Sequence, residues 1–201
     1  RFDEQRELID QAAAINPTSA LPEVMHATQL YHTWERTRET SYLDDAMRAL
    51  SRADEIQAEF PRTSMVRVAV LQAQEDDRGA MTELRGLVQR SPGFDEGRHL
   101  LIRLMLEAGR YEFAVEAAEE AVIANPGSAE WNESLGDLYR WRLRRAIDER
   151  EARGAQSRTG RELTREITEL RRNMQEQYEV TMEIAPSSRI LVKLAETLMT
   201  L

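Results

Sequence analysis

The sequence predicts an all-α protein, an α-solenoid built from antiparallel helix pairs, with one elongated helical hairpin. Apolar residues recur at helical spacing along the chain, and turn signals containing proline separate the helical stretches. Pro92 and Pro126 are 34 residues apart (126 − 92), and packing residues precede both prolines by 12, 8 and 5 positions. These are Ala80, Leu84 and Leu87 before the first proline, and Ala114, Ala118 and Ala121 before the second. Two copies of one spacing indicate a repeated two-helix unit.

Ten helices are expected, at about residues 2–15, 21–37, 42–59, 63–74, 78–90, 95–108, 111–124, 129–153, 161–184 and 188–200. The first ends at Asn16-Pro17, and the third carries a third packing set, Ala46, Leu50 and Ala53, before Pro61. The fifth and seventh end at Pro92 and Pro126, and the ninth ends at Pro186. A serine or threonine after each of these turns can cap the next helix.

The residues after Pro126, Leu135-Gly136-x-x-Tyr139, resemble the signature of the tetratricopeptide repeat family, although Trp131 stands one place earlier than the family's tryptophan. This resemblance implies one right-handed solenoid over residues 1–201. Its partial repeats would cover residues 1–19 and 189–201, and its full repeats 20–61, 62–94 and 95–128. A longer repeat, 129–188, would contain an inserted hairpin at 141–170. The resemblance also implies a protein-interaction scaffold with no catalytic activity.

In that family the first helix of each repeat lines a concave groove. Transferring the groove positions to this sequence implies a partner-binding surface made of Leu21, Val24, Thr28, Tyr31, His32, Met65, Gln72, Glu96, His99, Arg103, Leu106, Glu107, Glu130, Glu133, Asp137, Arg140 and Trp141. This groove would change from apolar to acidic along its length. The expected partner is therefore a protein or peptide segment with an apolar anchor and several Arg or Lys residues.

Two expectations refine this groove. Glu133 and Asp137 should be exposed, so reversing both charges should weaken partner binding without unfolding the protein. Val24 and Thr28 stand at positions where chaperone-binding relatives place lysine and asparagine, which disfavours an adaptor for heat-shock proteins.

The long hairpin is rich in arginine. From Arg140 to Arg172 there are 11 arginines against six acidic residues, whereas Glu107 to Asp137 holds eight acids against one arginine. The basic hairpin residues are Arg144, Arg145, Arg150, Arg153, Arg158, Arg161 and Arg165. As an alternative function, this surface would dock on an acidic protein, an anionic lipid or a nucleic acid. The favoured interpretation is that arginine and glutamate pair along a solvated hairpin.

Composition limits the function further. The chain of 201 residues carries a net charge of −9, which makes a nucleic-acid partner unlikely, and it has no apolar stretch of transmembrane length. It has no cysteine, so disulfides and thiolate metal sites are excluded. The 26 arginines against one lysine, Lys193, favour a bacterial source. Both the bacterial cytoplasm and the periplasm are compatible with this sequence, and no cofactor is expected.

One pattern could bind metal. Glu23-x-x-His26 and Glu96-x-x-His99 have the spacing that di-iron helical bundles use twice. In the repeat register the two motifs face different layers, and glutamate is abundant, so coincidence is the favoured interpretation and no metal site is expected.

The two ends of the chain lead to further expectations. The sequence starts at Arg1 inside a helix, so the natural chain is expected to begin upstream. The last helix is apolar around much of its circumference, with Ile190, Leu191, Val192, Leu194, Ala195, Leu198, Met199 and Leu201. A terminal solenoid helix usually has a polar outer face. Continuation of the natural chain is therefore expected, with self-association through this helix as the alternative.

Overall fold

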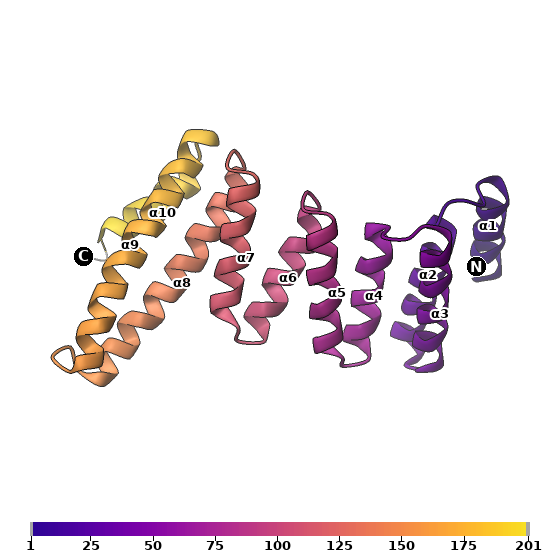
Figure 1. The fold of residues 1–201 in the computed structure, drawn as a ribbon, viewed down its shortest axis with the longest axis horizontal. Coiled ribbons are helices and arrows are strands. Elements are labelled where there is room, and N and C mark those ends of the chain that lie inside the picture. The colour runs from indigo at the N-terminus through magenta and orange to yellow at the C-terminus, as the bar shows by residue number, and fades with distance from the viewer. Residues whose placement is uncertain (1, 200–201) are drawn as a thin grey trace. The chain divides into compact units, whose positions relative to one another are not determined.

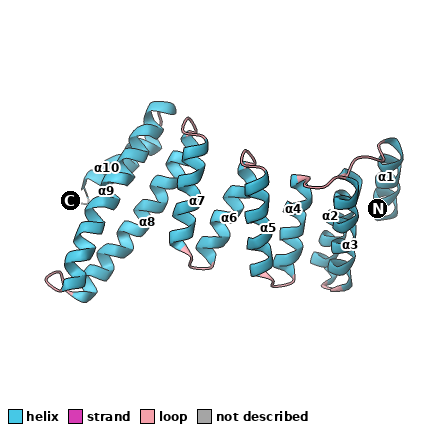
Figure 2. Cartoon of the chain, in the orientation of Figure 1, coloured by secondary structure: helices cyan, strands magenta, loops and turns pink. Residues whose placement is uncertain are grey.

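The computed structural model describes the backbone of residues 2–199 and the side chains of residues 6–197. This part of the chain contains ten helices joined by short turns and no strand (Figure 2). The helices pack as sequential antiparallel pairs, which confirms the predicted all-α class. Figure 1 labels them: α1 (Phe2–Ile15), α2 (Leu21–Thr37), α3 (Ser41–Ile56), α4 (Pro61–Ala73), α5 (Asp77–Arg90), α6 (Asp95–Glu107), α7 (Tyr111–Ala124), α8 (Ala129–Arg153), α9 (Arg158–Ile184) and α10 (Ser188–Met199).

Some helices begin at a different residue than expected, because a residue at the terminus starts or caps the helix where the sequence suggested a turn. Pro61 is the first residue of α4 instead of a turn residue before it, a position where its missing N–H costs nothing. Helix α9 begins at Arg158, three residues earlier than expected, because the Ser157 side chain accepts a hydrogen bond from the Gly160 amide at 2.9 Å. Asp76 and Ser128 cap α5 and α8 in the same way.

The chain divides into two compact units, residues 1–104 and residues 105–201. In the first unit, α2, α3 and α4 enclose a core of small and aliphatic side chains: Ala27, Leu30, Leu43, Ala46, Ala49, Leu50 and Val70. The packing sets predicted from the proline spacing are buried in both units, because Ala80, Leu84, Ala114 and Ala118 are fully inaccessible to solvent. Alanines at these positions let neighbouring helices approach closely.

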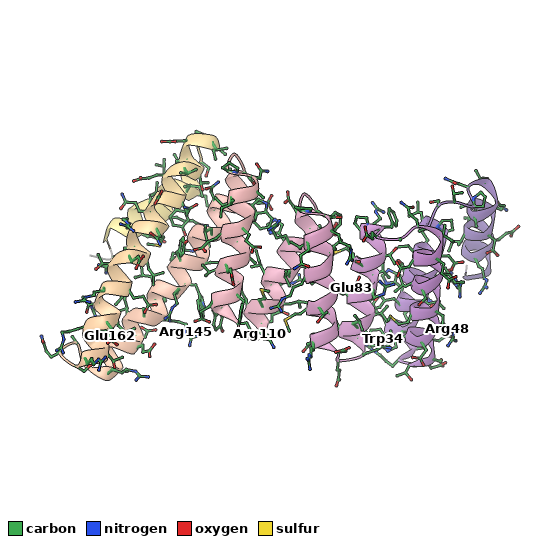
Figure 3. The ribbon with its side chains drawn as sticks, viewed as in Figure 1. Trp34, Arg48, Glu83, Arg110, Arg145 and Glu162 are labelled. Carbon is green, nitrogen blue, oxygen red and sulfur yellow. The ribbon has the colours of Figure 1, made fainter. Side chains whose placement is uncertain are left out.

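An ion-pair network joins α3, α4 and α5 in the first unit. The Arg67 guanidinium donates to Asp54 at 2.6 Å and to Glu83 at 3.2 Å, and Figure 3 labels Glu83 on α5. Because the Arg67 side chain is only 17% exposed, these contacts are less screened by water than a surface pair.

In the second unit, α8 and α9 form the elongated hairpin predicted from the sequence. Helix α8 has 25 residues and α9 has 27, whereas α7 has 14. At about 1.5 Å per residue, α9 is about 40 Å long and α7 about 21 Å. The closed end of the hairpin therefore lies beyond the end of α7 (Figure 1). Gly154, with φ of +80°, begins the turn at this end.

The last helix packs through one side. Ile190 of α10 is buried, and Leu191 and Val192 are more than half exposed. Leu198, Met199 and Leu201, which the sequence also assigned to an apolar face, have side chains outside the described residues. None of the described helices is both long and apolar enough to cross a membrane.

Candidate functional site

A candidate site in the first unit is an open hollow of about 980 Å³ along α2. We call it the first-unit hollow, and its lining consists of Leu8 and Ile9 of α1, Leu21, Val24, Met25, Thr28, Gln29, His32 and Arg36 of α2, Arg62, Met65 and Val66 of α4, and Glu96 of α6. Its volume is at the upper end of the range typical for ligand sites, about 300 to 1,000 Å³.

The lining is mainly apolar, and some of it faces solvent. Leu8 and Met25 are 63% and 47% exposed, and they are grouped with Leu21 in one hollow, which is more informative than single exposed apolar side chains elsewhere. The polar groups beside them are already bonded. The Thr28 hydroxyl donates to the Val24 carbonyl oxygen at 2.8 Å, and His32 Nδ1 lies 2.7 Å from a Glu35 carboxylate oxygen. The hollow can therefore bind apolar groups without displacing many of its own hydrogen bonds.

The structure brings part of the predicted groove together at this hollow. Six of the predicted residues line it: Leu21, Val24, Thr28, His32, Met65 and Glu96. Four predicted residues of the first unit are not part of the lining: Tyr31, Gln72, His99 and Arg103. Tyr31 instead packs against the core, with its ring centroid 5.6 Å from that of Trp34.

Seven residues of the lining were not predicted: Leu8, Ile9, Met25, Gln29, Arg36, Arg62 and Val66. Two of them come from α1, which the repeat register treats as a partial repeat outside the groove. A signal for Met25 and Arg36 was present, because positions 21, 25, 28, 32 and 36 form one stripe on an α-helix. The family positions alone did not include that whole stripe.

In the second unit, two of the predicted acidic residues, Glu133 and Asp137, are paired with cations of α10. Lys193 Nζ donates to Glu133 at 2.7 Å and to the two Asp137 carboxylate oxygens at 2.8 and 2.7 Å, and Arg189 also pairs with Glu133. The Glu133 and Lys193 side chains are only 15% and 12% exposed. The expectation that Glu133 is exposed was therefore wrong, because the chain supplies its own basic partners for this carboxylate, whereas the Asp137 side chain is 42% exposed.

The neighbouring predicted residues are also engaged within the unit. Arg140 pairs with Asp137 at 3.6 Å and with Glu196 of α10 at 3.3 Å. Trp141 stacks on Tyr111 with ring centroids 3.8 Å apart. The guanidinium of Arg145, which Figure 3 labels, lies 4.9 Å from the centroid of each ring. This stack connects the start of α7 to α8.

A smaller hollow of about 510 Å³ lies beside α10 and is lined by Arg140, Leu143, Arg144, Ile147, Met174, Glu196 and Thr197. Three further predicted groove residues, Leu106, Glu107 and Glu130, do not line it.

The hairpin arginines are in part paired with acids, as the favoured interpretation expected. Arg142 pairs with Glu166 across the hairpin at 2.6 Å, Arg153 with Glu149 at 3.2 Å, and Arg158 with Glu162 at 3.2 Å. Arg161 donates to the Gln156 carbonyl oxygen at 2.6 Å. Among the described residues, Arg144, Arg150 and Arg165 have no ion pair. The hairpin is therefore a mixed surface with no continuous arginine face.

The two Glu-x-x-His motifs do not converge. Glu23 pairs with Arg52 of α3 at 2.9 Å, and Glu96 lines the first-unit hollow. Burial, followed by the nearby charge of Arg6, lowers the pKa of His26, and its Nε2 atom is buried with no hydrogen-bond partner. Throughout the described part of the chain, no group of three or more His, Asp or Glu side chains is arranged to hold a metal ion.

Comparison with known proteins identifies the fold. No protein-family model and no curated protein matches the sequence. Among solved structures, YrrB, described as a TPR protein with an unusual peptide-binding site, is 16% identical, with a TM-score of 0.50 over 95% of this chain and 99% of YrrB. MamA is 13% identical, with a TM-score of 0.51 over 90% of this chain and 91% of its own.

A third neighbour, the human IFIT1 dimer with m7Gppp-AAAA, is 10% identical with a TM-score of 0.53, over 99% of this chain. The chain spans 43% of the IFIT1 chain. At such low identities these similarities show the fold, which is that of tetratricopeptide repeat proteins, as the resemblance implied.

Proposed function

We propose, from its tetratricopeptide repeat fold, that this chain is a non-catalytic interaction module that holds a segment of a partner protein in the first-unit hollow. The observation that carries this proposal is the exposed apolar lining shared by α1, α2 and α4, with Leu8, Leu21 and Met25 open to solvent. Proteins rarely leave large apolar side chains grouped in a concavity unless something binds there.

The energetics favour a peptide segment. Burying one large aliphatic side chain contributes about 1.5 to 3 kcal/mol, so two or three such side chains in the hollow can support binding in the micromolar range. The hydrogen bonds of Thr28 and His32 are made within α2, so they need not be broken when a ligand enters. A chemical reaction is not required to explain any of these features.

Selection of displayed random peptides on the purified protein tests this function. Selected peptides should protect amides of α2 and α4 from hydrogen exchange. Because Met25 is nearly half exposed, Met25→Glu should leave the fold intact and reduce the affinity by about tenfold or more. The control is Ile123→Glu, since Ile123 is 79% exposed on α7 and lies outside the hollow.

If instead the selected ligands protect the α8–α9 hairpin and are lost on replacing Arg150, Arg153, Arg158 and Arg161 by glutamate, the arginine-rich hairpin is the docking surface. In that case the proposal for the first-unit hollow is wrong.

A further inference from the structure

We infer that the segment held in the first-unit hollow is acidic as well as apolar, with carboxylates that bind Arg36 and Arg62 on either side of an apolar centre. This inference rests on the proposed function and specifies the chemistry of the ligand. It differs from the sequence-based expectation of a basic partner.

The first observation is the pairing of arginines in the first unit. Eight of the twelve described arginines there have a partner. Arg48 pairs with Asp45, Arg52 with Glu23, Arg67 with Asp54 and Glu83, and Arg90 with Glu59. Arg38 lies over the Trp34 ring, Arg98 donates to the Pro92 carbonyl oxygen at 3.0 Å, and Arg85 and Arg103 also interact with other residues. Arg36 and Arg62 line the hollow, and neither forms an ion pair or side-chain hydrogen bond with any described residue. Two guanidinium groups are therefore available at the hollow.

The second observation is that the hollow differs in charge from the unit around it. Residues 1–104 contain 18 acidic residues and 13 arginines, a net charge of −5. Among the residues whose side chains the structure describes, the lining of the hollow contains Arg36 and Arg62 against one carboxylate, that of Glu96. An acidic segment approaching this unit would be repelled by most of its surface and attracted to the hollow, which favours selective docking there.

The third observation is the position of the two arginines. Helices α2 and α4 both run antiparallel to α3, so they run in the same direction (Figure 1). Arg62 is in the first turn of α4 and Arg36 is in the last turn of α2, so the two arginines lie toward opposite ends of the hollow. The apolar side chains of Met25 of α2 and Met65 of α4, each about one turn into its helix, lie between these ends.

The extent of the hollow along α2 indicates the length of the ligand. Val24 and Arg36 both line the hollow and are 12 residues apart on this helix, a rise of about 18 Å. A bound segment would cover that distance with about 12 helical residues or about six extended ones. One carboxylate near each end and two or three apolar side chains between them would match the hollow. An arginine and a carboxylate can form two parallel hydrogen bonds, which adds directional specificity to the apolar contact.

This arrangement is distinct from the binding of a chain-terminal carboxylate. Neither Arg36 nor Arg62 occupies a groove position transferred from the family. Because the two arginines lie toward opposite ends of the hollow, we expect each to bind its own carboxylate, carried by a side chain within the segment. A peptide with a blocked C-terminus should therefore bind as well as one with a free C-terminus.

Three synthetic 12-residue peptides, blocked at both ends, test the inference. Each has the same leucine and methionine centre, with glutamate, glutamine or lysine at the flanking positions. In fluorescence anisotropy titrations of the full chain, the glutamate peptide should bind at least about tenfold more tightly than the lysine peptide, and its affinity should decrease as salt is added.

Three single variants locate the effect. Arg36→Glu and Arg62→Glu should each weaken binding of the glutamate peptide by about tenfold and strengthen binding of the lysine peptide. Arg78→Glu makes the same change of charge at an exposed position of α5 outside the hollow, and it should leave both affinities within about twofold. All three arginines, Arg36, Arg62 and the control Arg78, are exposed, so the substitutions should preserve folding.

The outcomes separate the inference from the proposed function. If the three peptides bind equally and protect α2 and α4 from hydrogen exchange, the acidic ligand is overturned and the docking site stands. Equal effects of Arg36→Glu and Arg78→Glu also overturn the acidic ligand. If neither these peptides nor any selected peptide protects α2 and α4, both the inference and the proposed function are wrong.

Discussion

Gly136 of α8 and Tyr178 of α9 are in such close contact that a side chain at position 136 has no room. A Cβ atom built on Gly136 would lie 2.6 Å from Tyr178 Cε1 and 2.9 Å from Cδ1. The tyrosine cannot easily move aside, because it is fully buried and its hydroxyl donates to Asp137 at 2.6 Å. Glycine is required at this position because of the close approach of the two helices.

Replacing this glycine should destabilise the second unit. We expect Gly136→Leu to lower the free energy of unfolding by about 2 kcal/mol or more, since overpacking a core costs about 1 to 3 kcal/mol before any gain in helix propensity. Urea unfolding followed by circular dichroism measures the change. Gly93→Ala is the control, because nothing lies within 4 Å of a Cβ built there. Gly136→Leu should also be made in a chain that carries Tyr178→Ala. If it lowers the free energy of unfolding equally in both chains, the clash with the Tyr178 ring is not the cause.

A second close approach involves Ala114 of α7, which is fully buried. Ala114→Leu should lower the thermal midpoint, because the added three carbon atoms have no cavity to enter and overpacking costs about 1 to 3 kcal/mol. Ala124→Leu places the same side chain at an exposed position on the same helix and should change the midpoint much less. An unchanged midpoint for Ala114→Leu would mean that the repeat register deduced from Pro92 and Pro126 is wrong.

The helices and their packing residues could be predicted because they depend on residues that lie close together in the sequence. Alanines 12, 8 and 5 residues before a proline, as at Ala114, Ala118 and Ala121, indicate a helix that packs closely and then ends. Those three residues are buried as expected. Boundaries were less predictable where one residue can act in two ways, as Pro61 can end one helix or begin the next.

The candidate site was predictable only in part, because it depends on contacts distant in sequence. The lining contributed by Leu8 of α1 is separated from Met65 by more than 50 residues, and no local pattern links them. The pairing of Glu133 with Lys193 spans 60 residues. Family groove positions indicate where a side chain stands on its own helix, but not whether another helix already covers it.

Two buried tyrosines should make the protein sensitive to alkaline pH. Burial, followed by the hydrogen bond to Asp137, raises the pKa of Tyr178, and burial followed by the hydrogen bond to Glu119 raises that of Tyr139. Because both pKa values are higher in the folded state, the stabilisation is complete below the pKa of an unfolded tyrosine, about 10, and decreases as pH increases above it.

We therefore expect the free energy of unfolding to decrease above about pH 10 by about 1.4 kcal/mol per pH unit for each of these tyrosines. Urea unfolding at several alkaline pH values measures this dependence, and ultraviolet absorbance detects tyrosine ionisation. Tyr178→Phe should be less stable at neutral pH but should lose stability less steeply at alkaline pH. Parallel pH profiles for the variant and the original chain would contradict this explanation.

The last prediction concerns Glu133 and Asp137, whose carboxylates accept hydrogen bonds from Lys193 of α10. Reversing both charges, Glu133→Arg with Asp137→Arg, places two guanidinium groups against Lys193 and Arg189. It also removes the carboxylate that accepts the Tyr178 hydroxyl. Since Glu133 and Lys193 are mostly buried, breaking their contact costs more than breaking an exposed pair. The expected result is loss of α10 packing.

Hydrogen exchange measures this loss, and amides of residues 188–199 should exchange at least about tenfold faster in the double variant. Glu116→Arg with Glu120→Arg is the control, since it makes the same change of charge at exposed positions of α7. Adding Arg189→Glu and Lys193→Glu to the reversed background should restore protection, because opposite charges again face each other. If α10 exchanges at the original rate in the double variant, packing around the buried Ile190 holds the helix in place, and the ion pairs with Glu133 and Asp137 contribute little.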